Sequence, residues 1–206
     1  MQFAKVGLAA GVITLLMLQG CVSTQYEVVA AEDTRIGSLA LSLNDNRWNL
    51  APRAVSTHLH KTSSIWTRDG VLLDQLILLA PIDHEQELFV SNDPDKLVYP
   101  TFRKEMLPNE VEELLQDSLT RQLGGGATVV TSNLRPRPWA GQRGIAFDLL
   151  IEYSDAAAQR GYVCAAVIDD QLHLIIYQAA KLHYFDTHWP AASAVIDSAQ
   201  TLAARN

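Results

Sequence analysis

The chain has 206 residues, of which 48% are apolar and 19% are charged, and this balance excludes a disordered or a fibrous protein. The formal net charge is -7, and an acidic surface does not attract phosphate backbones, so nucleic-acid binding is not expected. The length is enough for one domain with a full hydrophobic core and too short for two.

The first segment is an apolar run from Val6 to Leu18 that follows Lys5. It has the order of a secretory signal peptide and is too short to span a bilayer. The last four residues of this segment, Leu18-Gln19-Gly20-Cys21, resemble a bacterial lipobox. The resemblance implies that residues 1–20 are removed on export. It also implies that Cys21 becomes the first residue of the mature chain and carries a covalent lipid, a diacylglycerol and usually an acyl group such as palmitate.

The next segment, residues 21–36, is polar and has no sustained periodicity, so we expect a flexible tether before a single domain at 37–206. Val22 stands where an aspartate commonly retains lipoproteins at the inner membrane, and the lipobox resemblance therefore implies the periplasmic face of the outer membrane. With Cys21 lipidated, Cys164 has no partner for a disulfide. Its apolar neighbours predict a small buried side chain.

The domain is predicted to open with strands. Leucines alternate with smaller residues over 39–43, and a turn signal follows at 44–46. Residues 65–67 and 71–79 then form a hairpin around Asp69-Gly70, a strong turn pair.

A long connection is predicted at 83–102, which is rich in Asp, Asn and Pro, and a helix follows it. Asn109 is placed to cap this helix, with Glu112 in the capping-box position, and three glycines at 124–126 end it. Its apolar face consists of Val111, Leu114, Leu115 and Leu119.

The second half of the domain is predicted to be strands followed by a helix. The strands, each defined by alternating or continuous apolar residues, lie at 127–134, 145–153, 162–168 and 172–177. The last two flank a tight turn and have the composition of strands buried on both faces. The closing helix is capped by Asp186 or Thr187, has Pro190 in its first turn, and should lie across the sheet.

Strands joined mainly by hairpins, with one helix midway and one at the end, predict the α+β class: a single, mainly antiparallel sheet covered by helices. Five motifs lie along the domain: Trp66-Thr67-Arg68-Asp69-Gly70 with Leu73-Asp74, Phe102-Arg103-x-x-Met106, Asn133-Leu134-Arg135-Pro136, Gly141-x-x-Gly144-x-x-Phe147 and His183-Tyr184-Phe185. They resemble a family of small, uncharacterised bacterial lipoproteins. The order of elements is similar to the Mog1/PsbP-like α/β/α sandwich. These resemblances imply an envelope protein and a fold used mostly for binding, and they bring no catalytic residues.

Metal and catalytic chemistry is not predicted. His58 and His60 would lie on one side of a strand, but a metal site needs a third ligand, and the other histidines do not stand at ligand spacing with a carboxylate. The sequence contains neither a Gly-x-Ser-x-Gly elbow nor a phosphate-binding glycine loop ahead of a helix.

The densest positive cluster consists of Arg135, Arg137 and Arg143 with Trp139 among them. Guanidinium groups suit carboxylate or phosphate oxygens, and an indole can stack on a flat group, so these four residues are the candidate ligand site. The alternative, which we favour, is that the arginines pair with the surplus carboxylates of an acidic chain and that Trp139 covers the edge of the core.

These observations predict a membrane-anchored lipoprotein of the cell envelope. Its periplasm-facing domain would bind or interact without catalysis, with a protein partner in the same envelope and no cofactor besides the lipid on Cys21. The alternative is a protein that binds a small molecule, a lipid or an anion, either between sheet and helix or at the arginine cluster. A hydrolase is the third and weakest hypothesis, because no nucleophile or acid–base pair can be named from spacing.

Overall fold

The computed structural model describes residues 25–30, 34–43, 45, 47–91 and 97–202. The predicted signal peptide and Cys21 lie outside these residues. An eight-stranded antiparallel sheet forms the centre of the domain, in the order β1-β4-β5-β6-β10-β9-β8-β7. Its strands are β1 (Glu27–Val28), β4 (Asn49–Leu50), β5 (Ser64–Thr67), β6 (Asp74–Ile82), β7 (Ala127–Pro136), β8 (Gly144–Tyr153), β9 (Gln159–Ile168) and β10 (Gln171–Ala180).

A second, smaller antiparallel sheet accompanies the large one, where the sequence predicts a single sheet. It has the order β11-β3-β2, and its strands are β2 (Thr34–Ile36), β3 (Leu39–Leu41) and β11 (Gln200–Thr201). Two short 3-10 turns, η1 (Arg53–Val55) and η2 (Gly124–Gly126), complete the shorter elements.

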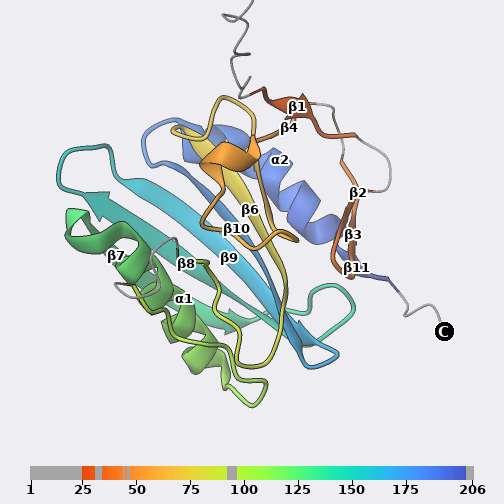
Figure 1. Cartoon of the computed structure of the whole chain (residues 1–206). Helices are drawn as coiled ribbons and strands as arrows, with labels where there is room; N and C mark the ends of the chain where they lie inside the picture. Colours follow the sequence, from red (N-terminus) through yellow and green to blue (C-terminus); the bar gives the residue numbers. More distant parts are fainter. Residues whose placement is uncertain (1–24, 31–33, 44, 46, 92–96, 203–206) are drawn as a thin grey trace, which may run out of the picture.

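Two helices cover opposite faces of the large sheet, which gives three layers (Figure 1). Helix α1 (Pro108–Leu123) packs along β7, and α2 (Tyr184–Ser198) packs against β10, β9, β6 and β3. The predicted α+β class and the helix-covered, mainly antiparallel sheet are confirmed.

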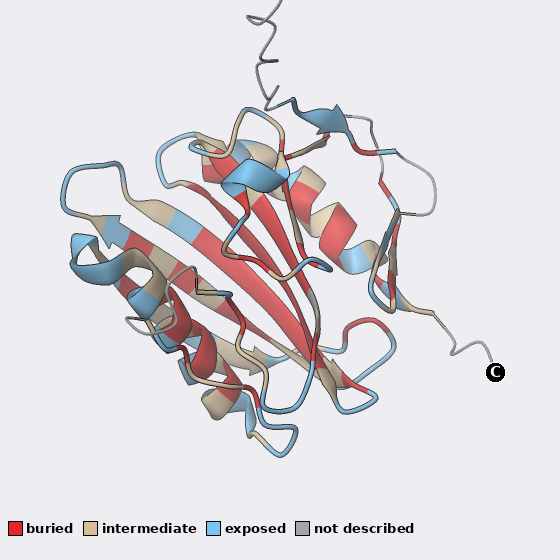
Figure 2. Ribbon diagram, in the orientation of Figure 1, coloured by how far each residue is buried: buried red, intermediate tan, exposed pale blue. Residues whose placement is uncertain are grey.

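The two faces of the sheet have separate hydrophobic cores, and Figure 2 shows buried residues concentrated in the central strands between the helices. The core on the α2 side includes Trp48, Trp66 and Phe185, and the core on the α1 side includes Phe102 and Phe147. Strands β9 and β10 have nearly continuous apolar sequences because both of their faces are covered, as predicted.

Cys164 in β9 is fully buried, which confirms the prediction for its side chain. Burial raises the pKa of its thiol to about 12. This thiol is therefore protonated and inert at neutral pH.

The domain begins earlier than the predicted boundary at residue 37. Glu27 and Val28 pair with β4, and Thr34 to Ile36 pair with β3. Val29 is buried in the core on the α2 side. The described part of the predicted tether thus contributes two short strands and one core residue, and the boundary was placed too late.

Helix α1 has the predicted apolar face, since Val111, Leu114, Leu115 and Leu119 are buried, but its predicted cap is wrong. The helix begins one residue before Asn109, at Pro108, whose missing N–H is no loss in the first turn. A Glu110 carboxylate oxygen accepts a hydrogen bond from Leu107 N at 2.7 Å. Glu110 therefore has the role that was predicted for Glu112.

Helix α2 also begins earlier than predicted, at Tyr184. Thr187 does not cap it but donates its hydroxyl proton to the carbonyl oxygen of His183 at 2.6 Å from within the first turn. Asp186 lies 3.3 Å from Arg160. Pro190 lies inside the helix on an exposed face, so the hydrogen bond that its ring removes is lost where water can replace it.

The hairpin of β5 and β6 is confirmed, but β6 begins at Asp74 instead of Val71. The buried carboxylate of Asp74 accepts hydrogen bonds from Thr67 Oγ1 at 3.1 Å, Arg68 N at 2.9 Å and Asp69 N at 2.8 Å. These bonds widen the turn to 68–73. None of the helices in the described part of the chain is long and apolar enough to cross a membrane.

Candidate functional site

Arg135 and Arg137, two of the predicted site residues, are paired with carboxylates of the chain. Arg135 lies 3.3 Å from a carboxylate oxygen of Asp148 and also donates to Asn133 O at 2.6 Å. Arg137 pairs with Asp197 of α2 and donates to the hydroxyl of Tyr162. Both guanidinium groups are therefore occupied within the domain, as the alternative interpretation of this cluster predicts.

Both arginines also stack on the same ring. The guanidinium carbons of Arg135 and Arg137 lie 5.3 and 5.4 Å from the ring centroid of Tyr162, within the range of a cation–π contact. Tyr162 is 7% exposed, so these contacts fix both side chains on a nearly buried surface.

Trp139 is 4% exposed and belongs to the core on the α2 side. Its Nε1 donates a hydrogen bond to Ile196 O in the last turn of α2, at 2.7 Å. The indole thus connects the β7–β8 loop to α2, and because it is buried its faces are not available to a ligand.

Arg143 is the member of the predicted cluster that remains open. It is exposed and makes no hydrogen bond or ion pair with any other described residue. The next residue is Gly144, where an added Cβ would lie 2.7 Å from the carbonyl oxygens of both Ala165 and Arg137. Only glycine permits the backbone segments to approach so closely here. This contact fixes the position of the backbone at the start of β8, directly after Arg143.

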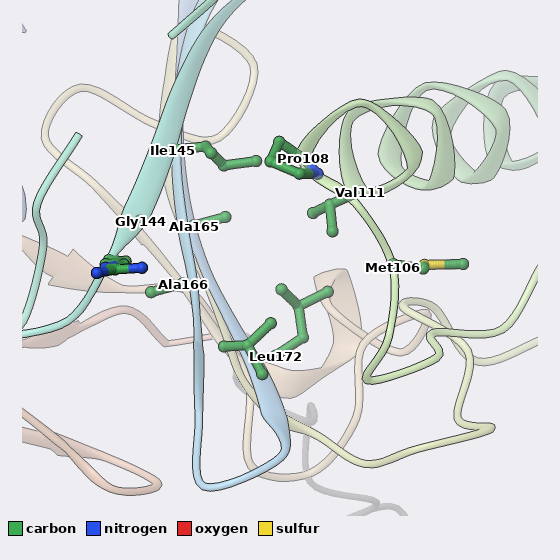
Figure 3. Close-up of a pocket in the computed structure, with 10 residues that line it drawn as sticks. Met106, Pro108, Val111, Gly144, Ile145, Ala165, Ala166 and Leu172 are labelled. Carbon is green, nitrogen blue, oxygen red and sulfur yellow. The ribbon is translucent and has the colours of Figure 1, made fainter. Parts of the chain in front are cut away.

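Arg143 stands at the rim of an apolar groove at the β9–β10 turn end of the sheet. One hollow of about 160 Å³ lies between the start of α1 and the sheet, and its lining comes from four segments: Met106, Pro108 and Val111; Arg143, Gly144 and Ile145; Ala165 to Val167; and Leu172. In Figure 3, Ile145 and Pro108 approach each other, and Val111 and Leu172 extend into the space between helix and sheet.

A second hollow of about 460 Å³ continues from the first. The two share Pro108, Arg143, Gly144 and Ile145, and the second extends along residues 134–138. We call the two together the α1–β8 groove. Its walls are mainly apolar, and the unpaired guanidinium of Arg143 is at its edge, so it suits an apolar group that carries a negative charge.

The predicted arrangement of His58 and His60 is wrong. Residues 58–60 lie in the connection between η1 and β5 and not in a strand. His60 Nε2 is 2.6 Å from Glu87 O, and the ring of His58 packs on Phe89 at 6.0 Å between centroids. Burial lowers the pKa of His58. Each imidazole has a separate structural contact, and the two do not face a common site.

One group of possible metal ligands was not predicted from the sequence. His188 Nε2 lies 2.6 Å from a carboxylate oxygen of Asp69, and ligand atoms of Asp69, Asp74 and His188 all lie within 4.8 Å of one another. The carboxylate of Asp74 already accepts three hydrogen bonds from the β5–β6 turn. The contact between Asp69 and His188 attaches this turn to α2. The three side chains therefore have a structural role, and we do not propose a metal site here.

The comparisons with known proteins concern the fold alone. No family model and no curated protein matches the sequence. Among solved structures, the chain is similar to cyanobacterial PsbP (CyanoP) from Synechocystis sp. PCC 6803, with a TM-score of 0.56 and 12% sequence identity. The alignment covers 89% of this chain and 98% of that one. The predicted PsbP-like sandwich is confirmed, and at this identity the likeness brings no activity with it.

Proposed function

We propose that the protein is a lipoprotein of the cell envelope, anchored through a lipid on Cys21 to the periplasmic face of the outer membrane, whose domain binds another envelope component without catalysis. The anchor is supported by the lipobox-like Leu18-Gln19-Gly20-Cys21 behind a short apolar run. Two or more acyl chains give a stable attachment, whereas a single chain gives a marginal one.

The proposal that the domain binds a partner rests on the α1–β8 groove and on the unpaired guanidinium of Arg143. Arg135, Arg137 and Trp139 are held by contacts within the domain, and Arg143 is left exposed beside an apolar surface. A matching partner presents an apolar side chain next to a carboxylate, so that the first fills the groove and the second reaches the guanidinium. We therefore propose as the partner a segment of another envelope protein in which an acidic residue stands beside an apolar one.

The second candidate occupant is a small molecule or lipid with an anionic group. The hollow between the start of α1 and the sheet favours it, because its lining includes the apolar side chains of Met106, Val111 and Leu172. The apolar portion of such a ligand would lie there, and its charged group would lie at Arg143.

Catalysis is not proposed, although one serine lies near a histidine. Ser38 Oγ is 3.3 Å from His173 Nε2. The imidazole is fully buried, and burial lowers its pKa to about 4, which makes it a weak base at neutral pH. Its Nδ1 has no hydrogen-bond partner among the described residues, so no carboxylate of this part of the chain orients it.

The anchor is tested by replacing the lipidated cysteine. Cys21→Ala is expected to abolish incorporation of labelled palmitate and to leave uncleaved precursor, because the thiol that receives the diacylglycerol is gone. Cys164→Ala is the matched control, since this buried thiol has no part in the anchor, and it should retain the label. A mature, membrane-attached Cys21→Ala protein would contradict the anchor.

The groove is tested by photo-crosslinking in intact cells. A photoreactive amino acid at Gln142, beside Arg143, is expected to give a discrete crosslinked product, whereas the same amino acid at exposed Glu113 of α1 should give none. The mass of the product distinguishes a protein partner from a small molecule or lipid.

Charge reversal completes this experiment. Arg143→Glu should reduce the Gln142 crosslink several-fold, because it places a carboxylate where the partner's anion would lie. Arg47→Glu makes the same charge change at another exposed position and should leave the crosslink unchanged. An equal product at Gln142 and Glu113, or no effect of Arg143→Glu, would argue against the groove.

A further inference from the structure

The most exposed large apolar side chains of the described residues gather at one end of the domain. Leu72 is 85% exposed, Leu182 is 82% exposed and Val28 is 65% exposed. Leu72 lies in the β5–β6 turn, Leu182 lies in the turn between β10 and α2, and Val28 lies in β1. A single exposed leucine is ordinary, but here three separate segments bring such residues to the same end.

Backbone pairing shows that these segments are neighbours. Ala180 N donates to Leu73 O at 2.9 Å, which joins the two turns that carry the leucines. Val28 pairs with Asn49, and Asn49 pairs with Thr67, the last residue of β5 before the same turn. β1 and these turns therefore form one end of the large sheet, the upper end in Figure 1.

The chain enters the described domain at this end. Gln25 is the first described residue and β1 begins two residues later. Cys21 and Gln25 are four peptide units apart, and since consecutive Cα atoms are about 3.8 Å apart, the two residues are at most about 15 Å from each other in any conformation. A lipid on Cys21 would thus hold the β1 end close to the membrane surface.

We propose that this end of the domain lies against the lipid bilayer, with Leu72 and Leu182 inserted at the boundary between headgroups and acyl chains. The inference rests on the proposed lipid anchor at Cys21. Two projecting leucines leave water on insertion, and the anchor keeps them within reach of the bilayer, so a weak insertion is enough to orient the domain.

Charge attraction is not what holds this end to lipid. Arg160 pairs with Asp186 at 3.3 Å, and the turns at this end carry exposed Lys181 as well as exposed Asp69. With both signs present, the surface has no strong preference for anionic lipid. The contact should therefore form on zwitterionic bilayers and persist at high salt.

The test uses the mature, lipidated protein in phosphatidylcholine vesicles, with a nitroxide attached to Leu72→Cys or to Leu182→Cys. Leu107→Cys is the matched control: it is 61% exposed and precedes α1 at the opposite, groove end of the domain. The engineered thiol is the reactive one, because Cys21 carries the lipid and Cys164 is fully buried. Electron paramagnetic resonance with oxygen and with a water-soluble nickel complex reports the depth of each label.

Labels at 72 and 182 are expected to be several-fold less accessible to the nickel complex than the label at 107, and more accessible to oxygen. Equal water exposure of all three labels, in protein whose mass includes the acyl chains, would overturn the inference and leave the anchor standing. A mature protein without acyl chains would overturn both the anchor and the inference.

Discussion

Replacing Trp139 with alanine is expected to destabilise the domain by about 3–5 kcal/mol, the usual cost of truncating a buried tryptophan. The ring is 4% exposed in the core on the α2 side, so the change leaves a cavity among well-packed side chains. It also removes the 2.7 Å hydrogen bond from Nε1 to Ile196 O, which joins the β7–β8 loop to the last turn of α2.

Two further variants separate the packing of Trp139 from its hydrogen bond and from the groove. Trp139→Phe keeps much of the apolar surface but loses the donor, so it should cost about 1–2 kcal/mol. Arg143→Ala, in the same loop but exposed, should change stability by less than about 0.5 kcal/mol. The measurement is the free energy of unfolding in urea.

Equal stabilities of the Trp139→Ala and Arg143→Ala proteins would show that the indole is not part of the core. The pair also divides the predicted ligand site by role. Trp139 is held in the core and bonded to α2, so it contributes to stability, whereas Arg143 is exposed and is the residue to which we assign binding at the proposed groove. This division could not come from the sequence, where the two residues stand four positions apart in one arginine-rich loop.

Elements whose signal is local were predictable. The apolar face of α1 follows from the spacing of Val111, Leu114, Leu115 and Leu119, and β9 and β10 follow from continuous apolar residues around a tight turn. The errors are also local in origin. The cap of α1 was misplaced by two residues because Asn109 is a good capping residue, while the Pro108 and Glu110 pattern determines where the helix begins.

Short edge strands gave no usable pattern. β1 has two exposed residues and β2 has three that are exposed or half-buried, so neither shows the alternation by which a strand is recognised. They form because β4 and β3 offer unpaired backbone groups beside them.

The candidate site was predictable only in part, because its contacts join distant parts of the chain. Arg137 pairs with Asp197 of α2, 60 residues away, and the walls of the groove come from five separate segments. A cluster of arginines in an acidic chain signals either an anion site or internal ion pairs, and the choice depends on which carboxylates the fold brings near. For Arg135 and Arg137 the fold supplies them.

The proposed groove and the proposed membrane contact lie at opposite ends of the large sheet. The groove is lined by Leu172 at the start of β10, whereas Ala180, at the end of the same ten-residue strand, adjoins the turn that carries Leu182. A strand of this length spans roughly 30 Å. If the leucine end rests on the bilayer, Arg143 faces the periplasm, where a partner in another part of the envelope can reach it.

Acidification is expected to weaken the fold through His173. This imidazole is fully buried in β10, and burial lowers its pKa from 6.5 to about 4. Between these two values the unfolded chain binds a proton and the folded chain does not, so stability decreases as the pH falls from about 6.5 toward 4. The full difference corresponds to about 3 kcal/mol, and above pH 6.5 this group adds no pH dependence.

The pKa of His173 is low because its ring is buried and a second ring proton would have no acceptor. Nε2 of His173 faces Ser38 Oγ at 3.3 Å, and Nδ1 has no partner among the described residues. Protonation would leave a buried, charged ring with an unpaired N–H at Nδ1, a cost that the folded protein avoids by keeping the ring neutral. The negative charge of Asp169 raises the pKa of His173 but does not overcome the effect of burial.

The measurement is the free energy of unfolding in urea at pH 7 and at pH 4.5 for the natural protein and for His173→Gln, which keeps a side-chain donor for Ser38 but does not titrate. The natural protein should lose about 2–3 kcal/mol more than the variant over this interval. His58→Gln serves as the control, because it removes another histidine of lowered pKa and should leave the His173 contribution in place. If the stability difference between the natural protein and His173→Gln stays constant from pH 7 to 4.5, the prediction is wrong. The buried imidazole would then bind a proton as readily as one in water.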